Sequence, residues 1–164
     1  MTFWTEGTAE PVRSYRFQIR QVGGEDPKDY WYAKSIDKPS FEVNTGTYQV
    51  SNHKFKFPGV LTWNDITMEI VDVGGKAKET LEEAFSFGYS KPDSGVKREG
   101  YSKHSNGEHF TMGIDQLDAA GKPIESWLLH GAFIKSVDFG TLAYADDDIV
   151  KISIGISYDY AILS

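Results

Sequence analysis

The sequence predicts a mainly β fold, a β-sandwich or barrel-like sheet of about six or seven strands with one lateral α-helix at about 76–87 and a long hairpin at about 40–57. Three observations support this class. Aromatic residues and glycine are abundant, with ten Phe, nine Tyr, four Trp and sixteen Gly, which is typical of strands joined by turns. Apolar and polar residues alternate in several segments, and one segment changes to a helical period. With 164 residues, we expect a single domain over residues 1–164.

The clearest strand pattern closes the chain, at residues 149–163. Side chains on a strand point to opposite faces with a period of two. One face of this strand is therefore expected in the core, and the strand must pair with neighbours in its own chain or in another. The two alternating sets are Ile152, Ile154, Ile156, Tyr158 and Tyr160 on the core face, and Ser153, Gly155, Ser157 and Asp159 on the other.

The same alternation predicts the earlier strands. Residues 14–22 place Tyr15, Phe17 and Ile19 on one face, and a strand at about 30–36 is expected to bury Trp31 or its neighbours. Further strands are predicted at residues 60–73, 108–118 and 124–137, with the apolar faces Ile66, Met68 and Ile70; Phe110, Met112 and Ile114; and Trp127 and Leu129.

A helical period predicts the helix at about 76–87. Residues Ala77, Leu81, Ala84, Phe85 and Gly88 fall on one face at the spacing of an amphipathic helix. The glutamates between them are expected in solvent, and Gly88 is a suitable end for the helix.

The segment at 40–57 predicts a long and polar hairpin. Its apolar residues are sparse, so part of it is expected to lack a core of its own. Two interpretations stay open: an ordinary solvent-facing hairpin, or a protrusion that docks on a partner. Residues 89–107 form a basic Gly/Ser-rich loop, which either faces an acidic patch on a neighbour or is solvated.

Composition excludes several classes of protein. Without cysteine, the chain has no disulfide, thiolate nucleophile or cysteine zinc site. A net charge of −7 argues against a protein that binds nucleic acid through its phosphates, because such binding needs a basic surface. No basic leader and no apolar run of membrane-spanning length is visible, so we expect neither a signal peptide nor a membrane protein.

The sequence carries no catalytic signature, and we expect a protein that is not an enzyme and has no cofactor or metal. His104 and His109 lack a metal-ligand spacing, and the acidic run 146–148 lacks the spaced ligands of a calcium loop. Glu69 and Asp159 are a conceivable carboxylate pair, but two carboxylates on strands are commonplace.

Taken in order, four segments resemble the tail tube protein of contractile-tailed bacteriophages. They are residues 15–19, residues 58–72 leading into the helix, residues 127–134, and residues 152–160 with the ending Tyr158-Asp159-Tyr160. The resemblance covers nearly the whole chain. It implies a structural subunit that assembles into stacked hexameric rings and forms the channel for genome ejection.

The resemblance also implies partners and sites. The partners are other copies of the chain, the tail sheath, baseplate and tape-measure proteins, and genomic DNA in transit without specific binding, in a virion tail assembled in the host cytoplasm. The resemblance implies that the N-terminal arm, residues 1–13, and the hairpin mediate the stacking of rings. The expected hairpin residues are Val43, Thr45, Tyr48, Val50, His53 and Phe55. The face expected to meet the channel or a neighbouring sheet carries Glu69, Ser153, Ser157 and Asp159.

Two alternatives remain. One is an inner-tube subunit of a related contractile injection or secretion system. The other is a soluble carbohydrate-binding β-sandwich that uses Trp31, Trp63 or Trp127 as a stacking platform.

Overall fold

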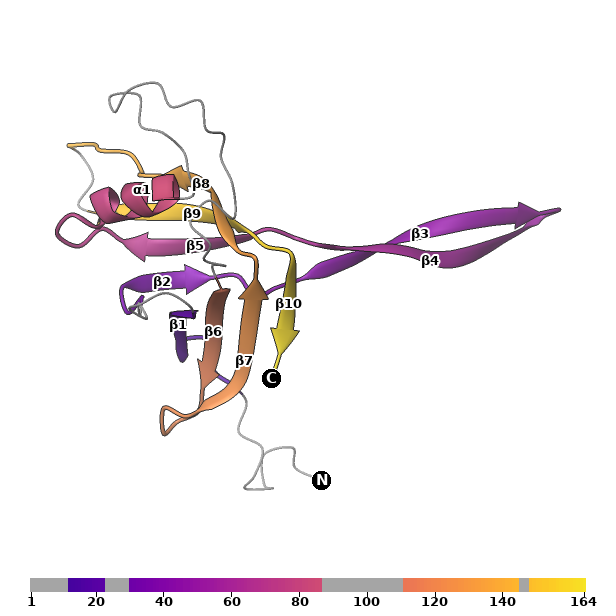
Figure 1. Cartoon of the computed structure of the whole chain (residues 1–164), viewed down its shortest axis with the longest axis horizontal. Helices are drawn as coiled ribbons and strands as arrows, with labels where there is room; N and C mark the ends of the chain where they lie inside the picture. The colour runs from indigo at the N-terminus through magenta and orange to yellow at the C-terminus, as the bar shows by residue number, and fades with distance from the viewer. Residues whose placement is uncertain (1–11, 23–29, 87–110, 145–147) are drawn as a thin grey trace.

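A computed structural model describes residues 12–22, 30–86, 111–144 and 148–164, with side chains in the helix described only as far as Leu81. The N-terminal arm up to residue 11, the basic loop and Phe110 lie outside the described residues. Within the described part there are ten strands, which form three antiparallel sheets, and one helix (Figure 1). The mainly β class predicted from the sequence is confirmed.

Two four-stranded sheets make up the body of the protein. Sheet A has the order β1-β6-β7-β10, and sheet B has the order β2-β5-β9-β8. The strands of sheet A are β1 (Phe17–Val22), β6 (Thr111–Leu117), β7 (Pro123–His130) and β10 (Tyr160–Leu163). Those of sheet B are β2 (Ala33–Ile36), β5 (Ile66–Val71), β8 (Phe133–Asp138) and β9 (Lys151–Ser157).

One hydrophobic cluster lies between the two sheets. In sheet B, β5 and β9 place isoleucines and a methionine in register, with the pairs Ile66 with Ile156, Met68 with Ile154, and Ile70 with Ile152. Sheet A contributes Ile19, Met112, Ile114 and Leu129. The core faces predicted from alternation are confirmed for Ile66, Met68 and Ile70 in β5, for Met112 and Ile114 in β6, and for Ile152, Ile154 and Ile156 in β9, all of which are buried. Two residues predicted for core faces are exposed instead, Tyr15 before β1 and Tyr160 in β10.

The chain passes between the sheets at two corners, and there the predicted long strands are wrong. The segment 124–137 divides at Gly131, whose φ of 64° is a left-handed conformation that favours glycine. The segment 149–163 divides after Ser157, where the Asp159 N–H donates to the His130 carbonyl at 3.0 Å. Each predicted strand is thus two strands in different sheets, so the strand count exceeds the predicted six or seven.

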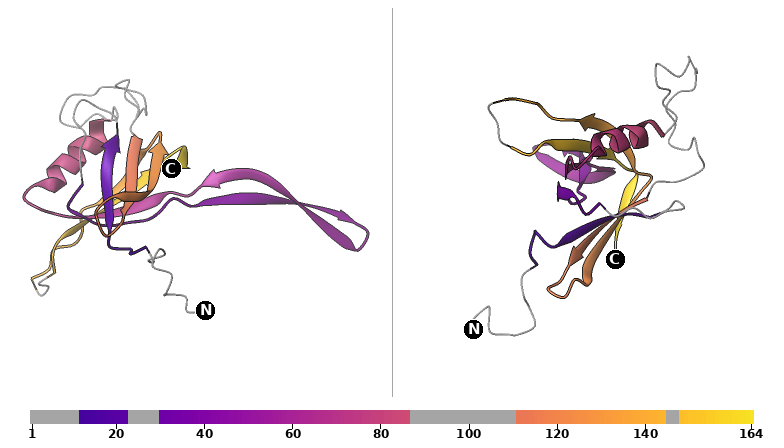
Figure 2. Two further views of the ribbon diagram at one scale, coloured as in Figure 1. Left: turned by 90° about the horizontal axis from the view of Figure 1, so that it is seen from below. Right: turned by 90° about the vertical axis from the view of Figure 1, so that its left-hand side faces the viewer.

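A third sheet, the hairpin of β3 (Phe41–Val50) and β4 (His53–Trp63), projects from the body (Figures 1 and 2). It extends beyond the predicted end at residue 57, because Pro58 and Gly59 lie inside β4. The predicted strand start at residue 60 is wrong for the same reason. The prediction for residues 30–36 holds for Tyr30, which is buried, while Trp31 is exposed.

The predicted helix is confirmed as α1 (Lys76–Ser86). Ala77 packs against the core cluster and Thr80 is buried, whereas Leu81 of the predicted apolar face is partly exposed. No helix among the described residues has the length and apolarity to cross a membrane. The same residues hold no cluster of three or more His, Asp or Glu that is placed to bind a metal ion.

Candidate assembly surfaces

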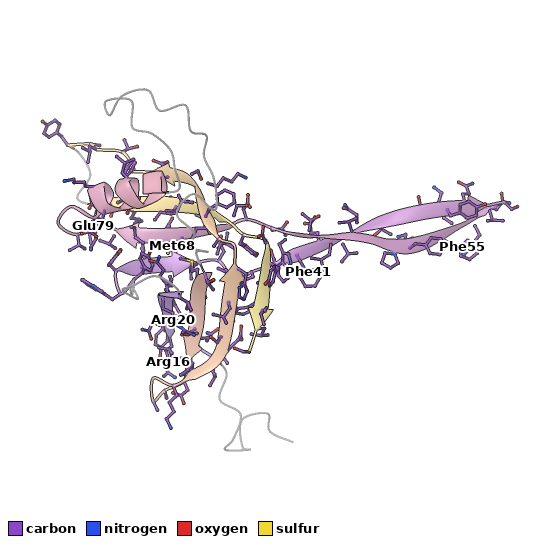
Figure 3. All side chains as sticks on the ribbon, viewed as in Figure 1. Arg16, Arg20, Phe41, Phe55, Met68 and Glu79 are labelled. Carbon is purple, nitrogen blue, oxygen red and sulfur yellow. The ribbon has the colours of Figure 1, made fainter. Side chains whose placement is uncertain are left out.

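The hairpin is the most exposed element that the structure describes. Every residue of β3 is exposed, and in β4 all but Trp63 are exposed. An isolated two-stranded hairpin is marginally stable in water at best. Phe41 lies at the base of the hairpin and Phe55 near its far end (Figure 3). The element therefore carries aromatic side chains well away from the core of its own chain.

The distal half of the hairpin has two chemically different faces. Cross-strand partners share a face, and the register pairs Tyr48 with Phe55, Val50 with His53 and Gly46 with Phe57. The opposite face pairs Thr47 with Lys56, Gln49 with Lys54 and Thr45 with Pro58. One face is thus mainly aromatic and apolar, and the other is polar and basic.

The predicted stacking residues are divided between these faces. Tyr48, Val50, His53 and Phe55 lie together, and the His53 and Phe55 rings meet edge to face at 4.7 Å. On β3, Val43 and Thr45 have the opposite parity and lie on the other face. Sequence reasoning did not include Phe57, although it is exposed and belongs to the aromatic face.

A β-bulge in β4 separates the distal half of the hairpin from its base. Val43 pairs with Leu61 and Thr45 with Pro58, so two residues of β4, Gly59 and Val60, lie opposite one residue of β3, Asn44. A Cβ on Gly59 would lie 2.8 Å from the Asn44 carbonyl oxygen, a contact that side chains do not make. Glycine is therefore needed here for the close approach of the two backbones.

Two ion pairs attach the base of the hairpin to the body. Before β3, the Lys38 ammonium lies 2.8 Å from Glu125 of β7 in sheet A. After β4, Asp65 lies 2.5 Å from the Lys135 ammonium of β8 in sheet B. Hydrogen bonds from Lys135 and then Ser157 lower the pKa of Asp65. The pKa of Glu125 is lowered in the same way by Lys38 and then by the Trp127 indole.

Aromatic packing completes the base. The Trp63 ring meets Phe41 at 5.3 Å and Tyr158 at 6.0 Å, and Tyr158 is buried in the core. The residues that flank the two hairpin strands are joined by a hydrogen bond, because the Asn64 N–H donates to the Ser40 carbonyl at 2.9 Å. The contacts of Trp63 connect the hairpin to the core, so the direction in which the hairpin leaves the body is defined by packing as well as by charge.

The outer face of sheet B holds three of the four residues predicted for a channel or inter-subunit face. Glu69 pairs with Ser153, and Ser157 follows on the same side of β9. Asp159 does not share this face, because the strand ends at Ser157 and Asp159 lies in the corner before β10. The polar face predicted for the last strand therefore ends at Ser157 and does not include Asp159.

Sheet A carries a charged network that sequence reasoning missed. Arg20 Nε donates to Asp115 Oδ2 at 2.7 Å, and the Ser126 hydroxyl donates to Asp115 Oδ1. Asp115 is buried although it lies on the outer face, because the Arg20 side chain covers it and passes over Gly113. The three residues come from β1, β6 and β7, and only the sheet order brings them together.

The three tryptophans predicted as a stacking platform, Trp31, Trp63 and Trp127, do not form one in the part of the chain that the structure describes. Trp63 and Trp127 are half-buried and pack against the core cluster, and Trp31 alone of the three is exposed, at 77 %. Trp127 also donates its indole N–H to Glu125 at 2.5 Å. Carbohydrate recognition by several coplanar exposed rings is not supported by this arrangement.

Comparison with known proteins shows similarity in fold. No family model and no curated protein matches the chain. A chain of the anti-feeding prophage baseplate, six-fold symmetrised, matches with a TM-score of 0.75 and 12 % identity over 95 % of this chain and 97 % of that one. A chain of the extended PVC sheath–tube complex, an extracellular contractile injection system, matches with a TM-score of 0.68 and 19 % identity. The match covers 96 % of this chain and 93 % of that one.

A phage protein shares the fold as well. The SPP1 tail tube matches with a TM-score of 0.60 and 10 % identity, over 94 % of this chain and 79 % of that one. The predicted resemblance to tail tube proteins is thus confirmed at the level of the fold. The similar structures come from both phage tails and contractile injection systems.

Proposed function

We propose that this chain is a structural subunit of the tube of a contractile particle, in which copies form hexameric rings that stack around a channel. The fold shared with tube proteins supports this role. The six-fold symmetry stated for the similar baseplate structure supports rings of six. The role is structural and requires no catalytic group or cofactor.

The observation that carries the proposal is the exposed hairpin. Monomeric proteins seldom expose contiguous apolar patches unless these are interaction sites. Here Tyr48, Phe55 and Phe57 are 64 %, 46 % and 55 % exposed on one face of an element with no core of its own. A neighbouring subunit that covers this face would stabilise the hairpin, and a stacked tube offers such a neighbour to every copy.

The sheet edges offer a second kind of contact. Strands β1 and β10 border sheet A, and β2 and β8 border sheet B. Unpaired edges tend to pair with other strands, and closing a sheet on itself removes them. In the proposed ring, sheets of adjacent copies join at their edges and enclose the channel.

The proposed particle has further components. A sheath surrounds the tube, a baseplate nucleates it, and a tape-measure protein defines its length. In a phage tail the channel carries the genome, and the net charge of −7 suits DNA in transit without binding. An injection-system tube is a second candidate, favoured by the higher TM-scores of the injection-system chains, 0.75 and 0.68 against 0.60.

Negative-stain microscopy of the concentrated protein tests the proposal. We expect rings or tubes at high concentration, or on addition of a purified baseplate. A matched variant deletes residues 47–56 and joins Gly46 to Phe57, a register pair, through an Asn-Gly turn. This variant should stay folded and should form no stacked tubes, because it keeps the sheet edges but lacks the hairpin. Sedimentation as a monomer for the unmodified chain at every concentration, with or without baseplate, would overturn the proposal.

A further inference from the structure

An open groove of about 670 Å³ lies on the outer face of sheet B, beside the segment that connects β8 and β9. Its floor includes Glu69 and Ser153, which are a register pair. The connecting segment forms the other wall, with Leu142 and Tyr144. The groove therefore has two unlike sides, a polar floor on the sheet and a connecting segment that carries large apolar side chains together with Asp148.

The connecting segment leaves β8 in a defined conformation. Asp138 Oδ1 accepts a hydrogen bond from the Gly140 N–H at 2.9 Å. Gly140 has a φ of 79°, and a Cβ at this position would lie 2.8 Å from the Lys151 carbonyl oxygen. Sharp bends of this kind require glycine. The start of the wall is thus positioned by the backbone of β8 and β9.

The apolar wall presents large side chains to solvent. Leu142 is 84 % exposed and Ile149 is 67 % exposed, and Tyr144 is fully exposed. Apolar exposure beside a concave surface is typical of an interaction site rather than of an ordinary loop.

The charge of the groove is opposite to that of the hairpin. Three carboxylates line the groove, Glu69, Asp138 and Asp148, together with Lys151, which lies beside Lys34. The hairpin from residue 43 to residue 63 carries Lys54 and Lys56 and has no Asp or Glu. A lysine-bearing hairpin is therefore a complementary occupant for a groove rich in carboxylates.

The hairpin and the groove lie at opposite ends of the molecule. In both Figure 1 and the left view of Figure 2, the hairpin extends to one side of the body, and the orange segment after β8 extends to the other. A copy is therefore unable to fill its own groove. A contact between two different surfaces of identical chains repeats head to tail and builds rings or filaments.

We propose that the distal hairpin of one copy, residues 45–58, docks in the groove of the next copy. Its aromatic face, with Tyr48 and Phe55, lies against the apolar wall. Its basic face, with Lys54 and Lys56, lies toward the carboxylates of the floor and rim. This inference rests on the proposed tube function and adds to it that Glu69 and Ser153 belong to an inter-subunit contact and not to an open channel wall.

Disulfide cross-linking tests the docking directly, because the chain has no cysteine of its own. The variant Phe55→Cys with Leu142→Cys places one thiol on each side of the proposed contact. Both positions are exposed, so the variant should fold normally. On oxidation under assembly conditions, we expect a ladder of covalent oligomers on a reducing-agent-free gel, with micrographs taken of the same sample. The matched control, Phe55→Cys with Ile124→Cys, uses an exposed residue that does not line the groove and should give at least tenfold less ladder.

The outcomes separate this inference from the tube function. Tubes with a ladder for the 55/142 pair support both. Tubes without that ladder, or with an equal ladder for the control pair, overturn the docking and leave the tube function standing. A ladder without rings or tubes supports the docking and contradicts the tube function. Neither tubes nor ladder overturns both proposals.

A charge exchange gives a second, independent test. Lys56→Glu should reduce assembly at least tenfold, and Asp148→Lys in the same chain should restore part of it. Because both positions are exposed, the monomer should keep its thermal stability. Loss of assembly that Asp148→Lys does not restore, with cross-linking also absent, would overturn the pairing of these two surfaces.

Discussion

Truncating Phe55 should weaken assembly strongly while leaving the free energy of unfolding of the monomer almost unchanged. The Phe55→Ala change lies on the aromatic face of the distal hairpin, where its neighbours are the cross-strand Tyr48 and the His53 ring at 4.7 Å. Cross-strand pairs of this type contribute about 0.2–1 kcal/mol. We therefore expect the free energy of unfolding of the monomer to change by no more than about 1 kcal/mol.

The expected effect on assembly follows from the exposed fraction of Phe55. An aromatic side chain presents roughly 200 Å², and 46 % of Phe55 is exposed in the monomer. If a neighbouring copy covers this area of about 90 Å², the contact gains about 2 kcal/mol at about 25 cal/mol per Å². Removing the ring should therefore raise the critical concentration for assembly by roughly 30-fold.

Sedimentation of the assembled fraction over a concentration series measures this change, and urea unfolding measures the monomer. The matched control is Ile124→Ala, because Ile124 has a similar exposed fraction, 51 %, but lies in β7 outside the hairpin. It should leave the critical concentration unchanged within about twofold. An unchanged critical concentration for Phe55→Ala, or an equal effect of the control, would refute the reasoning.

Three further predictions concern the body of the protein. Leu129→Ala removes a side chain that is fully buried between the sheets, so urea denaturation should show a loss of about 2–5 kcal/mol. Arg20→Met leaves the buried Asp115 carboxylate without its guanidinium, which should cost about 1–3 kcal/mol in the same assay, and adding Asp115→Asn should recover part of the loss. The pKa of Asp65 is lowered below its ordinary value of 3.8, chiefly by Lys135, so the stabilisation is present above that pH and is lost as the pH falls through the lowered pKa. Because the side chains of Lys135 and Asp65 are 61 % and 42 % exposed, solvent screens the pair and it is worth only about 0.2–1 kcal/mol. Lys135→Gln should raise the Asp65 pKa in an NMR titration, and no shift would contradict the pairing.

The core was predictable from the sequence because it depends on a local pattern. Ile66, Met68 and Ile70 bury one face wherever β5 lies, since the alternation of a strand is a property of its own backbone. The same is true of Ile152, Ile154 and Ile156 in β9. Helix α1 was predictable for the corresponding reason, because its apolar positions recur at a helical spacing.

The ends of strands were less predictable than their faces. Pro58-Gly59 resembles a turn, but in the structure it forms a bulge within β4, where the Asn44 carbonyl approaches Gly59. At the corner after β9 the alternation continues through the bend to Tyr158 and Tyr160, so the sequence shows no break there. At the corner after β7 the local signal is a single glycine, Gly131, with a left-handed φ of 64°. Whether a strand stays in its sheet or passes to the other one depends on partners that are distant in the chain.

The candidate assembly surfaces were likewise predictable where they depend on a local pattern and unpredictable where they depend on strand pairing. The sequence indicated a long, polar hairpin and named the exposed residues Tyr48, Val50, His53 and Phe55, which do share a face. It also extended the polar face of the last strand to Asp159, which the corner after Ser157 removes from that face. The groove beside Leu142 was not visible in the sequence, because Glu69 and Ser153 come together only through strand pairing.

By itself, the sequence determined that the chain is mainly β and which residues of β5, β6 and β9 enter the core, and it predicted a long, polar hairpin that in part lacks a core of its own. These are consequences of side-chain periodicity and composition, which act over a few residues. The tertiary structure decided which strands share a sheet, where β9 ends and β10 begins, and that the basic hairpin and the carboxylate-lined groove lie at opposite ends of the molecule. Those features depend on pairing between residues far apart in the chain, and a local pattern carries no information about such distances.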